Sequence, residues 1–132
     1  MSVQAQTFKI LVVDDEEDVR SLLGIMLEKR NFLVDQAANG KEALIKANTT
    51  APDIILLDIH MPGMDGFQVY RRLKELENTK NIPVIFCTAL RIPDIVAGMK
   101  SPIDDYMQKP FDFNLLHEKI NKIIKDTRRS GQ

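Results

Sequence analysis

Five side chains that can take part in chemistry stand at the ends of apolar or strand-like runs of the sequence. Asp14 and Asp15 follow the first run, Asp58 and Thr88 follow later runs, and Lys109 ends a short strand-like segment. Burying an unpaired charge is costly, so charged residues at the ends of buried strands need a reason. In an open parallel sheet, the carboxyl ends of the strands lie side by side and form the crevice in which ligands bind. We expect these five side chains to meet in one site.

The expected chemistry is phosphoryl transfer to one of these carboxylates. Carboxylates from two strand ends can share one Mg²⁺, which takes oxygen ligands and keeps several waters. Without the ion, Asp14, Asp15 and Asp58 would repel one another, and at least one pKa should rise. With it, one carboxylate can stay ionised and act as a nucleophile toward phosphorus, while Lys109 neutralises charge and the Thr88 hydroxyl adds a contact. An aspartyl phosphate can form in this way without a separate general base.

Strand-like and helix-like segments alternate along the chain. Short continuous apolar runs are typical of strands covered on both faces, whereas apolar residues three and four apart indicate helices. Pro93 and Pro102 leave room for only a short fourth helix. The pattern predicts an α/β protein with a parallel sheet and helices on both faces. The expected strands are 8–13, 32–37, 54–57, 84–87 and 105–108, and the expected helices are 16–30, 41–48, 67–77, 94–100 and 113–127.

The expected helices carry apolar faces that should pack on the sheet. These faces are formed in the first helix by Val19, Leu22, Leu23, Met26 and Leu27, in the third by Val69, Tyr70, Leu73 and Leu76, and in the last by Phe113, Leu116, Ile120, Ile123 and Ile124.

The composition excludes several classes of protein. The 132 residues are 44% hydrophobic, which suits one globular domain with one good core. A net charge of −1 gives no broad basic field for nucleic acid or an anionic membrane, and no apolar stretch approaches the ~20 residues that cross a bilayer. The single Cys87 cannot form an internal disulfide and is expected to be buried.

The chain is expected to contain one domain, at residues 8–127. Residues 1–7 are expected to form a disordered lead without a secretion signal, and residues 128–132 a tail or the start of a linker. The cytoplasm is the expected location.

Several motifs, in order, resemble those of the receiver domain of bacterial two-component response regulators. The resemblance extends from about Phe8 to Ile124. The matching motifs are Asp14-Asp15, Asn39-Gly40-Lys41-Glu42-Ala43-Leu44, Asp58 with Met61-Pro62-Gly63-Met64-Asp65-Gly66, Thr88-Ala89, Asp104-Asp105-Tyr106 and Lys109-Pro110-Phe111.

The resemblance implies a flavodoxin-like, doubly wound (βα)5 fold with strand order 2-1-3-4-5. It implies that Asp58 accepts a phosphoryl group from a sensor histidine kinase or a phosphotransfer protein. Mg²⁺ would be held by Asp15, Asp58 and the backbone carbonyl of His60, with Asp14 assisting directly or through water. A downstream effector protein or a fused output domain would read the signal. The domain would catalyse only its own phosphorylation and dephosphorylation and so is not expected to be an enzyme.

The resemblance also implies a switch. Thr88 and Lys109 would contact the phosphoryl group, and Tyr106 would turn inward as Thr88 is drawn toward it. The Lys109-Pro110 bond would be cis, which aims the amine into the site. The chain departs from its relatives at Pro102-Ile103, where they usually carry a small Gly-Ala pair.

Two alternatives from other classes remain at this point. One is a phosphohydrolase with Asp58 as its nucleophile, although the chain has no cap domain and no second acid spaced as a general acid. The other is a constitutive interaction module that keeps the fold without the switch, which the unusual segment from Arg91 to Ile103 favours.

Overall fold

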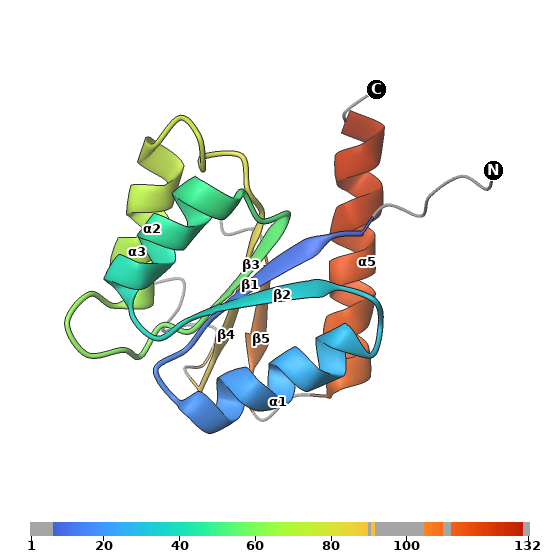
Figure 1. The fold of residues 1–132 in the computed structure, drawn as a ribbon, viewed down its shortest axis with the longest axis horizontal. Helices are drawn as coiled ribbons and strands as arrows, with labels where there is room; N and C mark the ends of the chain where they lie inside the picture. The colour runs from blue at the N-terminus through green and yellow to red at the C-terminus, as the bar shows by residue number, and fades with distance from the viewer. Residues whose placement is uncertain (1–6, 90, 92–104, 110–111, 131–132) are drawn as a thin grey trace.

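The computed structural model describes residues 7–89, 91, 105–109 and 112–130. Its centre is one sheet of five parallel strands in the order β2-β1-β3-β4-β5, which confirms the predicted fold class and strand order (Figure 1). The strands are β1 (Lys9–Val13), β2 (Leu33–Ala37), β3 (Ile54–Leu57), β4 (Val84–Thr88) and β5 (Asp105–Gln108).

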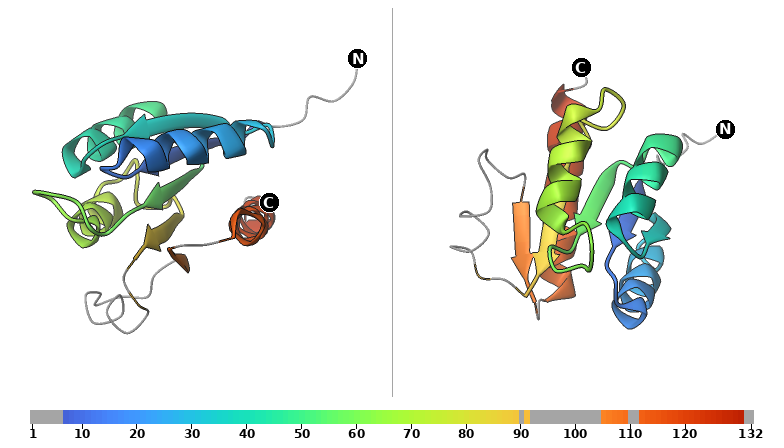
Figure 2. Two further views of the ribbon diagram at one scale, coloured as in Figure 1. Left: turned by 90° about the horizontal axis from the view of Figure 1, so that it is seen from below. Right: turned by 90° about the vertical axis from the view of Figure 1, so that its left-hand side faces the viewer.

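The described helices cover both faces of the sheet, as predicted. Figure 2 shows helices on each side of the sheet. The predicted helix 94–100 and the Pro102-Ile103 departure lie outside the described residues. The pair α2 (Gly40–Thr50) and α3 (Gly66–Glu75) packs on one face, and the pair α1 (Glu17–Glu28) and α5 (Phe113–Ser130) packs on the other.

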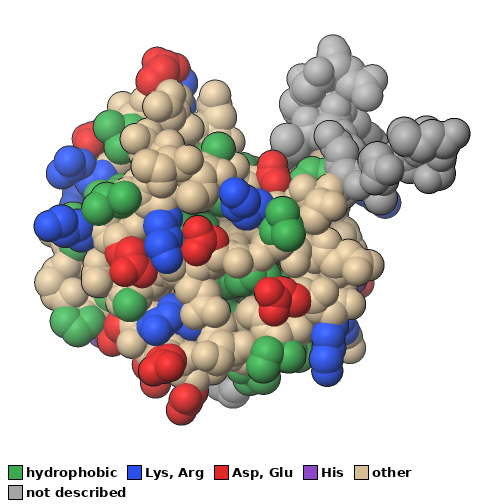
Figure 3. All heavy atoms as spheres, viewed as in Figure 1, with side chains coloured by type: hydrophobic (Ala, Val, Ile, Leu, Met, Phe, Trp, Pro, Cys, Tyr) green, Lys and Arg blue, Asp and Glu red, His purple; other side chains and the backbone are tan. Residues whose placement is uncertain are grey.

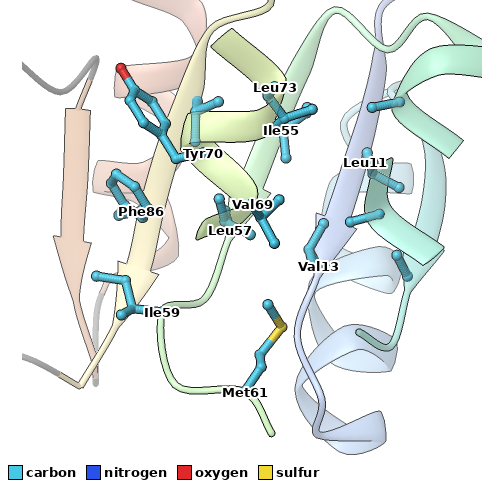
Figure 4. Close-up of a cluster of buried hydrophobic side chains, with 14 residues drawn as sticks. Leu11, Val13, Ile55, Leu57, Ile59, Met61, Val69, Tyr70, Leu73 and Phe86 are labelled. Carbon is cyan, nitrogen blue, oxygen red and sulfur yellow. The ribbon is translucent and has the colours of Figure 1, made fainter. Parts of the chain in front are cut away.

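Each face of the sheet has its own apolar cluster. The cluster under α2 and α3 joins Phe86 of β4 to Val69, Tyr70 and Leu73 of α3, as Figure 4 shows. The cluster under α1 and α5 contains Cys87, which is 3% exposed and therefore buried as predicted. The strands contribute alternate residues to the two clusters because successive side chains of a strand point to opposite faces.

Two apolar residues that were predicted to be buried are exposed. Leu22 is 59% exposed, because it lies at the edge of the buried stripe of α1, beside Leu23 at 5%. Leu76 is 38% exposed, because α3 ends at Glu75 and the extended backbone of Leu76 leaves the helical face.

Several predicted ends of elements were wrong by one to three residues. The strands β1 and β2 start one residue later than predicted, and β4 ends one residue later, at Thr88. The first helix is shorter than predicted, since Glu16 is its N-cap and Lys29 its C-cap. Both α2 and α3 begin one residue earlier, after the capping side chains of Asn39 and Asp65; α2 also ends later, at Thr50, and α3 earlier, at Glu75. The helix α5 continues to Ser130, beyond the predicted end at residue 127.

The surface carries both signs of charge. Figure 3 shows acidic and basic side chains interspersed over the face that is seen in Figure 1. No helix formed by the described residues is long and apolar enough to cross a membrane.

Candidate functional site

The register of the sheet places Asp14 and Asp58 next to each other. Val13 of β1 pairs with Leu57 of β3, so the residues that follow them leave neighbouring strands at the same level. The backbone N–H of Asp58 donates to the carbonyl of Val13 at 3.0 Å, which fixes this alignment. Asp14 is 2% exposed and Asp58 is 5% exposed. The structure therefore brings two carboxylates together where water screens them poorly.

Lys109 follows the edge strand β5 and contacts both carboxylates. Its Nζ lies 2.6 Å from Oδ2 of Asp14 and 3.7 Å from Oδ2 of Asp58. Its backbone N–H donates to the carbonyl of Thr88 at 2.7 Å, so the end of β4 positions the lysine. Burial lowers the pKa of Lys109, but the hydrogen bond to Asp14 and the charges of Asp58 and Asp14 outweigh it, and the pKa rises above 10.5. The raised pKa keeps the amine protonated.

The pKa of Asp58 is raised above its usual value of 3.8. Burial is the largest cause, and the charge of Asp14 is the second. The charge of Lys109 and the backbone N–H groups of His60 and Ile59 act in the opposite direction. This agrees with the expectation that clustered acids would raise at least one pKa. A further positive charge beside Asp58 would act in the same direction as Lys109 and lower this pKa.

Asp14 is the more firmly held of the two buried acids. Its Oδ1 accepts from the backbone N–H of Glu16 at 2.9 Å, and its Oδ2 accepts from Lys109. Its carbonyl accepts from Nη1 of Arg20 at 2.7 Å. Both carboxylate oxygens of Asp14 are therefore engaged in hydrogen bonds.

The acids that could hold a metal ion include one that was not predicted. Asp14, Asp15 and Glu16 each offer a carboxylate oxygen, and these oxygens lie within 4.8 Å of one another. Asp15 and Glu16 are exposed, so they face solvent beside the buried Asp14. Hard oxygen donors of this kind fit Mg²⁺. The run of acids from Asp14 to Glu17 is the feature of the sequence from which Glu16 could have been predicted as a further candidate ligand.

The loop after Asp58 is held against its carboxylate. The backbone N–H of His60 donates to Oδ1 of Asp58 at 3.3 Å, while the side chain of His60 is exposed. The N–H of Gly66 donates to the carbonyl of Ile59 at 2.9 Å. A Cβ at Gly66 would lie 2.4 Å from the carbonyl oxygen of Asp58, so only glycine allows this approach. The loop therefore fixes Asp58 as well as starting α3.

Asp65 starts α3 with a capping box. Its side chain accepts from the N–H of Gln68 at 2.9 Å, and the Gln68 side chain accepts from the N–H of Asp65 at 2.9 Å. Reciprocal bonds of this kind satisfy two free N–H groups of a helix start. They tie the end of the Asp58 loop to α3.

The two predicted switch residues lie on neighbouring strands. Thr88 ends β4 and is completely buried. Tyr106 of β5 pairs in register with Phe86, is half-buried, and packs against the cluster under α2 and α3. The Nζ of Lys119 lies 5.9 Å from the centre of the Tyr106 ring. Pro110, the predicted cis residue, lies outside the described part of the chain.

Comparison with proteins of known sequence shows the family to which this chain is similar. The family model of the response regulator receiver domain matches residues 10–121. The DNA-binding dual master transcriptional regulator RpaA of Synechocystis is 38% identical over 125 residues, which are 94% of this chain and 52% of that protein. The transcriptional regulatory protein ResD of Bacillus subtilis is 44% identical over 109 residues, which are 82% of this chain and 44% of that protein. The chain spans about half the length of these curated relatives.

Solved structures share the fold over nearly their full length. The receiver domain of a signal transduction histidine kinase from Syntrophus aciditrophicus superposes with a TM-score of 0.85 at 31% identity, covering 93% of this chain and 94% of that one. The chemotaxis protein CheY4 of Vibrio cholerae gives a TM-score of 0.83 at 28% identity, covering 89% and 99%. The match of the family model over most of the chain, together with these relatives, places this chain in the family of response regulator receiver domains of two-component systems.

Proposed function

We propose that this domain stores a signal as a phosphoryl group on Asp58. The observation that carries the proposal is the placement of the Asp58 carboxylate, which is 5% exposed and lies 3.7 Å from the ammonium of Lys109. Phosphoryl transfer needs mainly positioning and charge neutralisation around the transferring oxygens. A buried carboxylate with a cation beside it supports both needs.

In the proposed reaction, a carboxylate oxygen of Asp58 attacks phosphorus and forms an acyl phosphate. The bond between phosphorus and the donor nitrogen of a phosphohistidine breaks, and its electron pair leaves with the imidazole. Lys109 neutralises charge on the phosphoryl oxygens by moving from Asp14 toward them. Because its pKa is raised, the amine stays protonated through this exchange. The domain acts only on its own side chain, so it is a phosphoacceptor and not an enzyme with an outside substrate.

Mg²⁺ is the proposed cofactor. Asp15, Asp58 and the carbonyl of His60 would hold it, with Asp14 assisting. The chemistry of the donor set supports this, because exposed oxygens of Asp15 and Glu16 lie beside the buried Asp14. When bound, the ion would supply positive charge for the transferring oxygens.

The proposed output is a population shift between two arrangements. The phosphoryl group would draw the hydroxyl of Thr88, and Tyr106 would turn further inward behind it. The place of half-buried Tyr106 on β5, beside the strand that ends at Thr88, supports this coupling. If partner affinity were the same with and without a phosphate mimic, the switch would be rejected and the constitutive module would replace it.

The proposed partners follow from the family. A sensor histidine kinase or a phosphotransfer protein would supply the phosphoryl group, and an effector protein or a fused output domain would receive the signal. Two relatives named as transcriptional regulators are about twice as long as this chain, which supports an output domain in those proteins.

The direct test is phosphorylation by a small donor. Incubation with Mg²⁺ and acetyl phosphate should add one phosphoryl group, as measured by intact mass spectrometry. The variant Asp58→Asn should gain none, whereas the control Asp65→Asn, a change at the capping residue of α3, should still be modified. An unmodified wild-type protein, or an undiminished gain in Asp58→Asn, would reject the proposal. Multiple turnover of a phosphate ester would instead favour the phosphohydrolase.

A further inference from the structure

A cavity lies at the opposite end of the sheet from Asp58. It has a volume of about 390 Å³ and lies between the start of β1, the connection from α1 to β2, and α5. Figure 1 shows the start of β1 and the connection from α1 to β2 on the side of the molecule where α5 lies, away from the start of α1. The apolar residues that line this cavity are Phe8, Phe32 and Ile124.

The charged groups of this cavity have one sign. Arg30 and Lys125 line it, and none of its described lining residues is an acid. Neither cation forms an ion pair with a carboxylate of the described residues. Cations without an acidic partner around a concave surface attract an anion.

Arg30 is held in place by its neighbours. Its guanidinium lies 4.4 Å from the centre of the Phe113 ring. Its Nη1 donates to the carbonyl of Met26 at 3.3 Å, and its Nη2 donates to Oδ1 of Asn114 at 3.4 Å. Guanidinium has five N–H donors, so others remain for a ligand. A fixed side chain loses little freedom when a ligand binds.

The wall of the cavity offers aromatic faces and neutral donors. The ring of His117 lies 5.9 Å from that of Phe32 at an interplanar angle of 85° and 6.4 Å from that of Phe113 in a stacked arrangement. Burial, and then the charge of Arg30, lower the pKa of His117 below 6.5. Asn31 and Asn121 add carboxamides to the lining. These groups suit a flat apolar body beside an anionic head.

We propose that this cavity binds a small organic anion that combines a flat apolar body with a carboxylate, sulfonate or phosphate head. The head would lie against Arg30 and Lys125, and the body against Phe32 and Ile124. The volume lies within the range of about 300–1,000 Å³ that ligand cavities occupy. The site is separate from Asp58 and is independent of phosphorylation.

The larger groove of the domain does not fit the same ligand. It measures about 590 Å³ and is lined mainly by apolar residues of α1 together with Phe113. Lys109 is the cation among its described lining residues, and this lysine is paired with Asp14 at 2.6 Å. An anion there would compete with a buried carboxylate for the same ammonium. The charge pattern therefore distinguishes the two cavities.

Naphthalenesulfonate is a suitable probe, because it has the required shape and charge and cannot donate a phosphoryl group. Amide NMR of the labelled protein in Mg²⁺-free buffer should show saturable shifts at residues 30–32 and 117–125. Uncharged naphthalenemethanol should bind more weakly. Absence of saturable shifts, shifts confined to Val19–Met26, or equal binding of the neutral analogue would overturn the proposal.

Variants test the charge requirement. Arg30→Gln should lower the affinity for the probe about tenfold, the size expected for one lost charge-assisted hydrogen bond. Arg30→Lys should retain part of the affinity. Lys125→Gln provides a second test at an exposed position, and it should also weaken binding. Leu22→Ser, in the larger groove, and Asp58→Asn should leave the affinity unchanged. Unchanged binding in both charge variants would reject the site.

Discussion

The ammonium of Lys109 lies closer to Asp14 than to Asp58, at 2.6 Å against 3.7 Å. The cation is therefore paired with a neighbour of the proposed phosphoacceptor in this arrangement. A phosphoryl group on Asp58 would offer new oxygens to the ammonium of Lys109. Movement of the ammonium from Asp14 to these oxygens would couple phosphorylation to the end of β4, because the backbone N–H of Lys109 donates to the carbonyl of Thr88.

Lys109→Gln should destabilise the domain in Mg²⁺-free buffer. The change leaves Asp14 and Asp58 buried without their common cation. The free energy of unfolding should fall by roughly 2 kcal/mol. This is below the range for a fully buried pair, because the lysine side chain is 19% exposed. Urea unfolding measures it, and added Mg²⁺ should restore more stability to the variant than to the wild type. Lys80→Gln is the control, since its exposed pair with Glu77 should be worth less than about 1 kcal/mol. Equal losses in the two variants would contradict the assignment.

Asp58→Asn should stabilise the Mg²⁺-free domain at neutral pH. The folded pKa of Asp58 is raised, so the folded state holds its proton more firmly than the unfolded state does. Below the ordinary value of 3.8 the carboxyl is protonated in both states and costs nothing; as the pH rises above it, ionisation costs the folded state stability. The advantage of the variant should therefore appear above that pH and vanish below it.

Thermal unfolding across this pH range measures the advantage of Asp58→Asn. The exposed control Asp126→Asn should change stability by less than about 0.5 kcal/mol. An advantage of Asp58→Asn that grows toward acid pH would refute the raised pKa.

Gly66→Ala should disturb both stability and phosphorylation. The new Cβ would lie 2.4 Å from the carbonyl oxygen of Asp58 and 2.6 Å from the Cα of Ile59. Backbone must move to relieve these contacts, at a cost of about 1–3 kcal/mol. The rate of modification by acetyl phosphate should fall, because Asp58 moves with its backbone.

The matched control is Gly24→Ala in α1. Its Cβ would meet Nε2 of Gln36 at 3.4 Å, an ordinary contact. The change should be neutral or stabilise the domain by up to about 1 kcal/mol, since alanine favours helix. If Gly66→Ala and Gly24→Ala had the same effect on stability and on the rate of modification, the close approach of Gly66 to Asp58 would not matter for function.

Asp15→Asn and Glu16→Gln should separate the two exposed acids of the metal cluster. Asp15 is the proposed ligand, so its variant should lose at least about tenfold in Mg²⁺ affinity. Glu16 acts at the start of α1 through its backbone N–H, which Gln retains, so its variant should lose little. Isothermal titration calorimetry is the suitable measurement, because the chain has no Trp for fluorescence. A larger loss in Glu16→Gln would reassign the ligand.

The amino-acid sequence alone determined the fold class and the position of the site. The short continuous apolar runs predict strands that are buried on both faces, and the apolar residues three and four apart predict helices with one buried face. Together they predict a parallel sheet covered by helices. Polar residues after those runs had to meet, since strand ends share one edge. Asp14, Asp58 and Lys109 do so.

Only the tertiary structure decided which groups pair and which surfaces stay open. The preference of Lys109 for Asp14 depends on distances across 95 residues of chain, which no local pattern encodes. The exposure of Leu22 and the basic cavity beside Arg30 depend on how α1 and α5 meet on the sheet. The spacing of residues fixes the face on which a side chain lies, but packing between elements fixes what that face touches.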